Sequence, residues 1–218
     1  MVTLPVARAR GRLTVFLGYA AGVGKTYAML SDAHELLSDG VDVLVGYVEP
    51  HARPETLTLL DGLPTLTSKR VAYRGITLNE LDMDAALGRR PTVMLVDELA
   101  HANAPGSRNE KRYQDVEDLL QAGIDVHTTM NIQHVERLSR VVGDLTGVRI
   151  RETVPDHIFD QADEVRIIDL EPEDLLRRLA AGKVYSPDRV RLATQNFFAV
   201  DNLRALREMT IREGVVRG

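Results

Sequence analysis

The sequence predicts an α/β fold: a three-layer sandwich with a mostly parallel central sheet and a small C-terminal α/β extension. Three observations predict it. Strand-like and helix-like segments alternate along the chain, which is typical of a parallel sheet flanked by helices. Thr92–Val96 is apolar without alternation, as expected for a strand covered on both faces. A glycine-rich turn, Gly18–Thr26, joins the first expected strand to the first expected helix.

The first half of the chain is divided by its apolar periodicity and by its helix and strand breakers. Leu13–Leu17 is a short apolar run and predicts a buried strand. A helix over Lys25–Ser38 gathers its apolar side chains on one stripe, and Gly40 ends it. The valine-rich segment Asp42–Val48 predicts the second strand. We expect three further short elements: a helix at Glu55–Leu60, a strand at Lys69–Tyr73, and a helix at Asn79–Leu87 capped by Asn79 or Thr77.

The second half continues the alternation. Ser107–Glu110 fits a capping box and predicts the start of a helix that Gly123 ends. Ile124–Thr129 predicts a strand, and Asn131 predicts the cap of the next helix. For the extension we expect strands at Arg149–Thr153 and Val165–Leu170, and helices at Pro172–Ala181, Pro187–Asn196 and Asp201–Arg212, the last capped by Asp201. The expected organisation is a flexible lead-in over residues 1–11, a core over 12–147 and the extension over 148–218.

Composition excludes several classes of protein. With 218 residues, 44% of them hydrophobic, the chain can bury the core of one α/β domain. A net charge of -5 argues against a general nucleic-acid or membrane-surface binder, which usually carries a basic excess. The absence of cysteine excludes disulfides and thiolate zinc sites and suits a reducing compartment. No apolar run reaches the ~20 residues of a membrane helix. We therefore expect a cytoplasmic domain with no membrane insertion.

The beginning of the chain allows a second interpretation. Arginines at positions 8, 10 and 12 precede the apolar run Leu13–Val23, as in a signal peptide. We prefer to divide this run into the strand and the glycine-rich turn, because the turn ends in a lysine that a signal peptide would not place there.

The segment Gly18-Tyr19-Ala20-Ala21-Gly22-Val23-Gly24-Lys25-Thr26 has the context of a Walker A loop. Glycines let successive backbone amides point at a phosphate, and the helix N-terminus adds its own unpaired donors. Lys25 would contact the β- and γ-phosphates, and the Thr26 hydroxyl would bind Mg2+. Tyr19 departs from the pattern, which has glycine there, and the alternative is a tight glycine turn with an exposed lysine. This loop makes the predicted fold P-loop NTPase-like, with ATP and Mg2+ as cofactors.

Asp97 and Glu98 follow the apolar strand directly, as in a Walker B motif. Asp97 is placed to hold Mg2+ together with Thr26. Glu98 is the candidate catalytic residue, since a carboxylate there can orient an attacking water, and its alternative is a solvated or structural carboxylate. The full predicted cofactor-binding set is Gly18, Ala21, Gly22, Val23, Gly24, Lys25, Thr26, Tyr27, Asp97 and Thr129.

Weaker candidates lie at neighbouring strand ends. Thr128, Thr129 and Asn131 follow the next strand, where a γ-phosphate contact competes with helix capping. Glu49, His51 and Arg53 follow the second strand, at the edge where open α/β sheets bind ligands. His101 is interpreted as a loop histidine, and Lys111 and Arg112 as a solvated helix face that could touch phosphate or a partner.

Two other enzyme classes fit the sequence less well. A RecA-like motor needs basic and aromatic nucleic-acid loops, whereas aromatic residues make up 5% of this acidic chain. A small-molecule kinase needs an arginine-rich lid after the core, and none is identified.

Long strings of the chain are similar to the N-terminal domain of the KdpD family, the osmosensitive potassium-channel sensor histidine kinases. The similar segments are Val15–Leu30, Glu49–Thr56, Val96–Arg112, Asp115–His134, Val154–Glu164, Arg177–Tyr185 and Asn202–Glu208. The family's ATP site corresponds to Gly18–Thr26, and Asp97 with Glu98 corresponds to its Walker B-like pair. The family pattern has proline at Ala21 and a small residue at Tyr19, so loop stiffness and affinity could differ here.

The resemblance implies a nucleotide-binding input domain of a two-component sensor histidine kinase in the bacterial inner membrane. That kinase would respond to potassium limitation or osmotic stress. The implied partners are ATP and the remainder of the kinase: stress-protein-like, membrane and kinase domains. The chain ends soon after Glu208, so we expect no autophosphorylation by this segment, whether it is cut from a longer protein or naturally short. Three hypotheses stay open: a regulatory ATP-binding domain, a slow ATPase that uses Glu98, and a partner-binding module.

Overall fold

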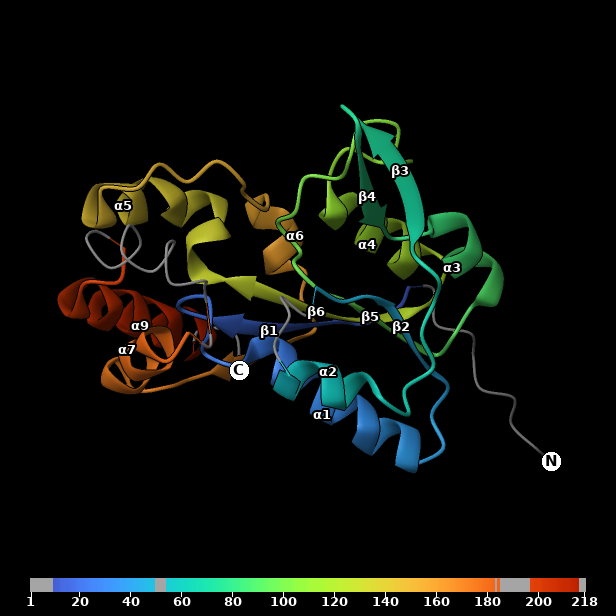
Figure 1. Cartoon of the computed structure of the whole chain (residues 1–218), viewed down its shortest axis with the longest axis horizontal. Helices are drawn as coiled ribbons and strands as arrows, with labels where there is room; N and C mark the ends of the chain where they lie inside the picture. The colour runs from blue at the N-terminus through green and yellow to red at the C-terminus, as the bar shows by residue number, and fades with distance from the viewer. Residues whose placement is uncertain (1–9, 50–53, 183, 185–196, 216–218) are drawn as a thin grey trace.

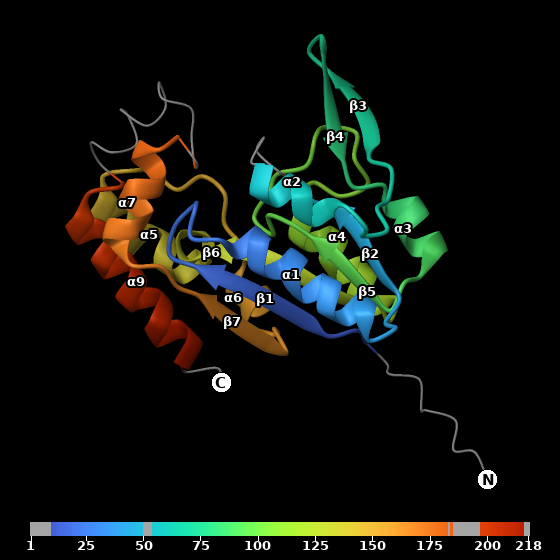
Figure 2. The same cartoon turned by 60° about the horizontal axis from the view of Figure 1, so that its bottom comes forward.

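A computed structural model describes residues 10–49, 54–182, 184 and 197–215. Its centre is a five-stranded sheet in the order β2-β5-β6-β1-β7, and every neighbouring pair is parallel. Figures 1 and 2 show this sheet with helices on both sides. The strands are β1 (Leu13–Gly18), β2 (Val43–Tyr47), β5 (Val93–Val96), β6 (Asp125–Asn131) and β7 (Glu164–Ile168). The predicted α/β class with a parallel central sheet is confirmed.

Two hydrophobic clusters, one on each face of the sheet, make the sandwich three layers thick. On one face, α1 (Lys25–Ser38) and α2 (Pro54–Leu60) pack over Phe16, Val45 and Leu95. On the other face the helices pack over Val15, Leu17 and Val96. The helices of this second layer are α3 (Met83–Arg89), α4 (Arg112–Gln121), α5 (Glu136–Thr146), α6 (Asp156–Asp160), α7 (Pro172–Ala180) and α9 (Val200–Val215).

The central strands are apolar along their whole length because both of their faces are covered. All six residues of β1 and all four of β5 are buried. Neighbouring side chains of β1, such as Val15 and Phe16, belong to opposite clusters. This confirms the prediction made from the unalternated run Thr92–Val96. Because all five strands are parallel, their carboxyl ends share one edge of the sheet.

The predicted helix at Asn79–Leu87 is wrong in its first half. Residues Ile76–Glu80 form β4, which pairs antiparallel with β3 (Lys69–Tyr73). The hairpin turns at Arg74 and Gly75, both with positive φ, and it projects from the body of the molecule (Figure 1). The helix starts only at Met83, and its cap is Asp82, whose Oδ1 accepts from Ala85 N at 3.0 Å. Neither Thr77 nor Asn79 caps it.

Three other local predictions fail. The helix predicted to open at Ser107–Glu110 begins at Arg112, and Gln114 Oε1 accepts from the Lys111 amide at 3.0 Å. Asn131 caps no α-helix: β6 runs through it into a 3-10 turn, η1 (Ile132–His134). Arg149–Thr153 forms no strand, and only an isolated bridge joins Val154 to Val135.

Most of the remaining elements lie within one or two residues of their predicted bounds, including the helices at residues 25 and 172 and the strand near 165, while the last helix ends three residues beyond the predicted Arg212, at Val215. The last helix begins at Val200, so Asp201 lies in its first turn and is not its cap. The helix predicted at Pro187–Asn196 lies outside the described residues. Although β7 belongs to the predicted extension, it pairs with β1, which places it in the central sheet beside the glycine-rich turn.

Candidate functional site

A cavity of about 140 Å³ opens at the carboxyl edge of the sheet. The ends of β1, β5 and β6 meet there, because Gly18 of β1 is level with Asn131 of β6, and Val96 of β5 is level with Thr128 of β6. The predicted site residues that line the cavity are Ala21, Gly22, Lys25, Thr26, Asp97, Glu98 and Thr129. The structure therefore brings together the two motifs that the sequence analysis selected separately. Gly18, Val23, Gly24 and Tyr27 do not line the cavity, and the Tyr27 side chain is exposed.

The loop Gly18–Thr26 needs its glycines for conformation and for space. Gly22 and Gly24 have φ of 93° and 108°, a region that other residues rarely adopt. A Cβ on Gly18 would lie 2.6 Å from Val23 Cγ2. A Cβ on Gly22 would lie 2.5 Å from Val184 Cγ2. The loop is thus curled tightly at the start of α1, where amides of the first helical turn have no partner within the helix.

Tyr19, which departs from the predicted pattern, does not obstruct the cavity. Its ring is 1% exposed and belongs to the hydrophobic core. Its hydroxyl donates to Leu170 O at 2.9 Å, and burial raises the pKa of the phenol. Tyr19 therefore anchors the loop to the segment that follows β7.

The first turn of α1 meets the end of β5 through a hydroxyl and a carboxylate. Thr26 Oγ1 lies 3.2 and 3.4 Å from the two carboxylate oxygens of Asp97. Lys25 Nζ donates to Ala20 O at 3.0 Å, so the ammonium group is held across its own loop. Hydroxyl and carboxylate oxygens are the ligand types that Mg2+ prefers, and a bound Mg2+ would take its other ligands from phosphate or water.

Asp97 is a buried carboxylate, 1% exposed. Burial raises its pKa, against the hydrogen bond from Thr129 and the charge of Lys25. Its other donors are the amides of Glu98 at 3.2 Å and Glu49 at 3.4 Å. A buried carboxylate in need of positive charge is a suitable cation ligand, because the cation offsets the cost of desolvation.

Glu98 adopts a left-handed backbone conformation, with φ of 60°. Few residues other than glycine do so, and such outliers concentrate at functional sites. Its amide donates to Thr129 Oγ1 at 3.2 Å as well as to Asp97. These bonds turn the chain sharply after β5 and leave Glu98 in the wall of the cavity.

Sequence reasoning missed two residues that line the same cavity, His134 and Glu152. Asn131 and His101 line it as well. His134 Nδ1 lies 2.8 Å from Glu152 O, and Glu152 Oε1 accepts from Ala102 N at 3.0 Å. Asn131 was considered, but Glu152 has no sequence signal: it lies in an irregular segment that only the fold brings here.

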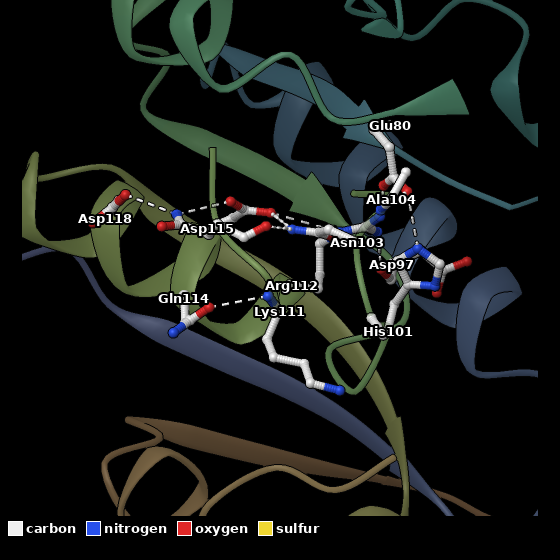
Figure 3. A network of polar contacts seen from close by, with 12 residues as sticks. Glu80, Asp97, His101, Asn103, Ala104, Lys111, Arg112, Gln114, Asp115 and Asp118 are labelled. Carbon is white, nitrogen blue, oxygen red and sulfur yellow. Dashed lines mark hydrogen bonds and ion pairs between the residues drawn. The ribbon is translucent and has the colours of Figure 1, made fainter. Parts of the chain in front are cut away.

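Arg112, predicted to lie on a solvated helix face or to touch phosphate, is completely buried. It donates to Glu80 Oε2 at 2.9 Å, to Asn103 Oδ1 at 3.2 Å and to Asp97 O at 3.1 Å (Figure 3). Its guanidinium also lies over the Tyr47 ring, 4.2 Å from the centroid. Arg112 therefore supports the backbone that carries Asp97 and does not face the cavity.

Glu80 is the carboxylate that pairs with Arg112 in this network. Burial alone would raise its pKa, but hydrogen bonds from His101 and Ala104 and the charge of Arg112 outweigh burial and lower it. His101, predicted to be a plain loop histidine, lines the cavity with its Nε2 3.3 Å from Glu80 Oε1. The hairpin and the cavity wall are thus joined through one buried carboxylate.

Of the remaining weak candidates, Thr128 and Glu49 do not line the cavity. The Thr128 side chain is buried, and its Oγ1 has no hydrogen-bond partner within the described part of the chain. Glu49 contributes its amide to Asp97 and accepts from Tyr47 Oη at 3.1 Å. His51 and Arg53 lie outside the described residues.

Comparisons with known proteins agree on one family. A family model described as the osmosensitive K+ channel His kinase sensor domain matches residues 9–216. Over 203 residues the chain is 55% identical to the sensor protein KdpD of Escherichia coli K12 and 53% identical to that of Clostridium acetobutylicum. Each match covers 93% of this chain and 23% of the relative, so the chain spans about a quarter of the length of these curated relatives. No helix among the described residues is long and apolar enough to cross a membrane.

Replacing Arg112 by methionine should destabilise the protein strongly. The Glu80 carboxylate would be left buried without its cation, which costs about 3–5 kcal/mol of unfolding free energy. Denaturant unfolding at pH 7 measures this loss. Glu80→Gln in the Arg112→Met background should restore part of the stability, because it removes the orphaned charge. If the double variant is no more stable than the single one, the charge of Glu80 is not what Arg112 compensates.

Proposed function

Because the chain belongs to the KdpD sensor-domain family, we propose that it is an ATP-binding regulatory domain of a sensor histidine kinase that responds to potassium limitation or osmotic stress. The observation that carries the nucleotide part is the convergence of Lys25, Thr26 and Asp97 on one cavity beside a loop of left-handed glycines. This arrangement offers backbone amides, a helix N-terminus and an ammonium group to an anion, and two oxygen ligands to a cation.

In this proposal Lys25 pairs with the β- and γ-phosphates, while Thr26 and Asp97 hold Mg2+. When bound, the metal neutralises phosphate charge. The chain's own contribution is to hold the metal ligands in place. Thr129 and the Glu98 amide donate hydrogen bonds to the Asp97 carboxylate, and Arg112 donates to the Asp97 backbone carbonyl oxygen. The cavity is large enough for phosphates and a metal, but a whole nucleotide usually needs about 300 Å³ or more. The nucleoside would therefore lie outside it.

A series of hydrogen bonds that connects the glycine-rich loop to α9 supports a regulatory role. Tyr19 donates to the carbonyl of Leu170, and the residues on either side of Leu170 are Asp169 and Glu171. Both carboxylates bind Arg207 of α9, at distances of 2.6–2.7 Å. A nucleotide that reshapes the loop would act on α9 through these contacts. It can bias the output only if its affinity differs between the two signalling states.

A slow ATPase is the second candidate, and Glu98 is the observation that favours it. A carboxylate that lines the cavity from a left-handed position next to a metal ligand can orient a water toward the terminal phosphate.

The binding proposal predicts that Lys25→Ala weakens MgATP binding at least about tenfold, since a charge-assisted hydrogen bond contributes about 1.5–3 kcal/mol. Isothermal titration calorimetry on the wild type and the variant measures this change. Lys69→Ala is the matched control, because Lys69 is an exposed lysine on the hairpin and outside the cavity. Equal affinities in wild type and Lys25→Ala would rule out phosphate binding by this loop.

The ATPase candidate predicts that Glu98→Gln lowers the rate of phosphate release by about 100-fold with little change in MgATP affinity, as expected for loss of a general base. A phosphate-release assay under saturating MgATP measures both proteins. A wild type that binds MgATP but releases no phosphate would remove this candidate and leave the regulatory one intact.

The regulatory proposal predicts that nucleotide binding changes amide hydrogen exchange in α9, and that Tyr19→Phe reduces this change. The variant loses only the hydrogen bond to Leu170, so its affinity for MgATP should stay within about threefold of wild type. Tyr73→Phe on the hairpin is the control and should respond as the wild type does. An unchanged α9 response in Tyr19→Phe would show that the signal does not pass through this bond.

A further inference from the structure

The lining of the cavity that holds Lys25 also includes a histidine, His134, whose hydrogen bonding is fixed by the backbone. His134 ends η1, and its Nδ1 lies 2.8 Å from the carbonyl oxygen of Glu152. A carbonyl can only accept, so Nδ1 carries the hydrogen and Nε2 is the remaining ring nitrogen. A backbone hydrogen bond also joins the two segments that carry His134 and Glu152, since Val154 N donates to His134 O at 2.7 Å. The imidazole is thus a positioned group and not a mobile one.

The surroundings of His134 favour the neutral form of its imidazole. Burial lowers its pKa, and the charge of Lys25 lowers it further. The hydrogen bond to Glu152 and the charges of Glu152 and Glu98 act in the opposite direction, but burial dominates. A neutral imidazole with Nδ1 protonated presents a lone pair at Nε2. That lone pair would repel a phosphate oxygen unless a proton arrives with the phosphate.

The charges around the cavity favour such a proton. Among the described residues that line it, Lys25 is the ammonium group, while Asp97, Glu98 and Glu152 are carboxyl groups. A triphosphate adds about four negative charges at neutral pH, and Mg2+ with Lys25 offsets only part of them. A proton on His134 adds positive charge and converts Nε2 from an acceptor into a donor.

Asn131 offers a second polar contact on the same wall. Its Oδ1 is buried and has no hydrogen-bond partner within the described part of the chain. Buried amide groups are normally paired, so an unpaired one beside a cavity is a position where a bound group can supply a hydrogen-bond partner. Rotating the amide about its last bond would present Nδ2 in place of Oδ1, which is the donor that a phosphate requires.

We propose that His134 and Asn131 bind the terminal phosphate of a nucleoside triphosphate, and that His134 takes up a proton as this phosphate binds. The inference rests on the proposed nucleotide binding and adds to it a basis for telling triphosphate from diphosphate. On this proposal, a diphosphate held by Lys25 and Thr26 lacks the phosphate that His134 and Asn131 would contact. Because protonation accompanies triphosphate binding, affinity for the triphosphate rises as pH falls through neutrality, and affinity for the diphosphate changes less.

Calorimetry in buffers of different ionisation enthalpy tests this directly. The wild-type chain is titrated with the Mg2+ complexes of ADP and of the β,γ-imido analogue of ATP, in PIPES and in Tris at pH 7.5. The dependence of the observed enthalpy on the buffer gives the number of protons taken up. We expect greater uptake with the triphosphate analogue than with ADP. His134→Gln should remove the excess and weaken the analogue about tenfold, the equivalent of one pKa unit, with ADP affinity unchanged.

His157→Gln is the matched control, because His157 is exposed on α6 and outside the cavity. Protons gained or lost by the nucleotide itself contribute equally in wild type and His134→Gln, so the difference in proton uptake between the two proteins excludes them. If neither nucleotide binds the wild type, the proposed function fails. If both bind but proton uptake is the same in wild type and His134→Gln, the proposed function stands and this inference is overturned.

A second measurement needs no variant that might misfold. Nuclear magnetic resonance of the imidazole groups in wild-type protein should show the pKa of one histidine, His134, rising when the triphosphate analogue is bound and staying low with ADP. A histidine spectrum that titrates identically with the two nucleotides would overturn the inference, even if His134→Gln were unstable.

Discussion

The buried carboxylate of Asp97 is the group on which the rest of the site depends. It is almost inaccessible to solvent and accepts hydrogen bonds from Thr26 and Thr129 and from two backbone amides. These donors come from different parts of the chain, so the carboxylate joins α1 to the ends of β5 and β6. Burial raises its pKa, and the hydrogen bond from Thr129 and the charge of Lys25 offset only part of this rise. Such a group is costly to the fold and suited to binding a cation.

Support for Asp97 comes from a second buried charge. Arg112 reaches the Asp97 carbonyl, and Glu80 of the hairpin β3–β4 balances the guanidinium. A buried ion pair contributes little net stability, but it fixes geometry because either partner alone would be costly. The hairpin, the start of α4 and the end of β5 are therefore held in one arrangement. His101 extends the same network to the cavity wall.

The loop Gly18–Thr26 must leave space for a ligand and must also be anchored to the core of the protein. Its glycines keep side chains away, so that the backbone can curl toward a ligand. Tyr19, in contrast, has a large side chain buried in the core and bonded to the segment after β7. One side of the loop thus faces the cavity, and the other is packed against the elements that carry α9.

The sequence by itself determined the elements whose signals are local. Apolar periodicity, glycine positions and the strand-to-helix context located the sheet, α1, the glycine-rich loop and the Asp97–Glu98 pair. Tertiary structure decided the rest. The hairpin β3–β4 was predicted partly as helix because five-residue strands leave little periodicity and its turn residues, Arg74 and Gly75, are a weak signal. Arg112 looked exposed in sequence because its partners, Glu80 and the Asp97 carbonyl, are 32 and 15 positions away. His134 and Glu152 likewise lie in contact beside the cavity only because the chain between α5 and α6 returns to the sheet edge, and long-range contacts of this kind leave no trace in local composition.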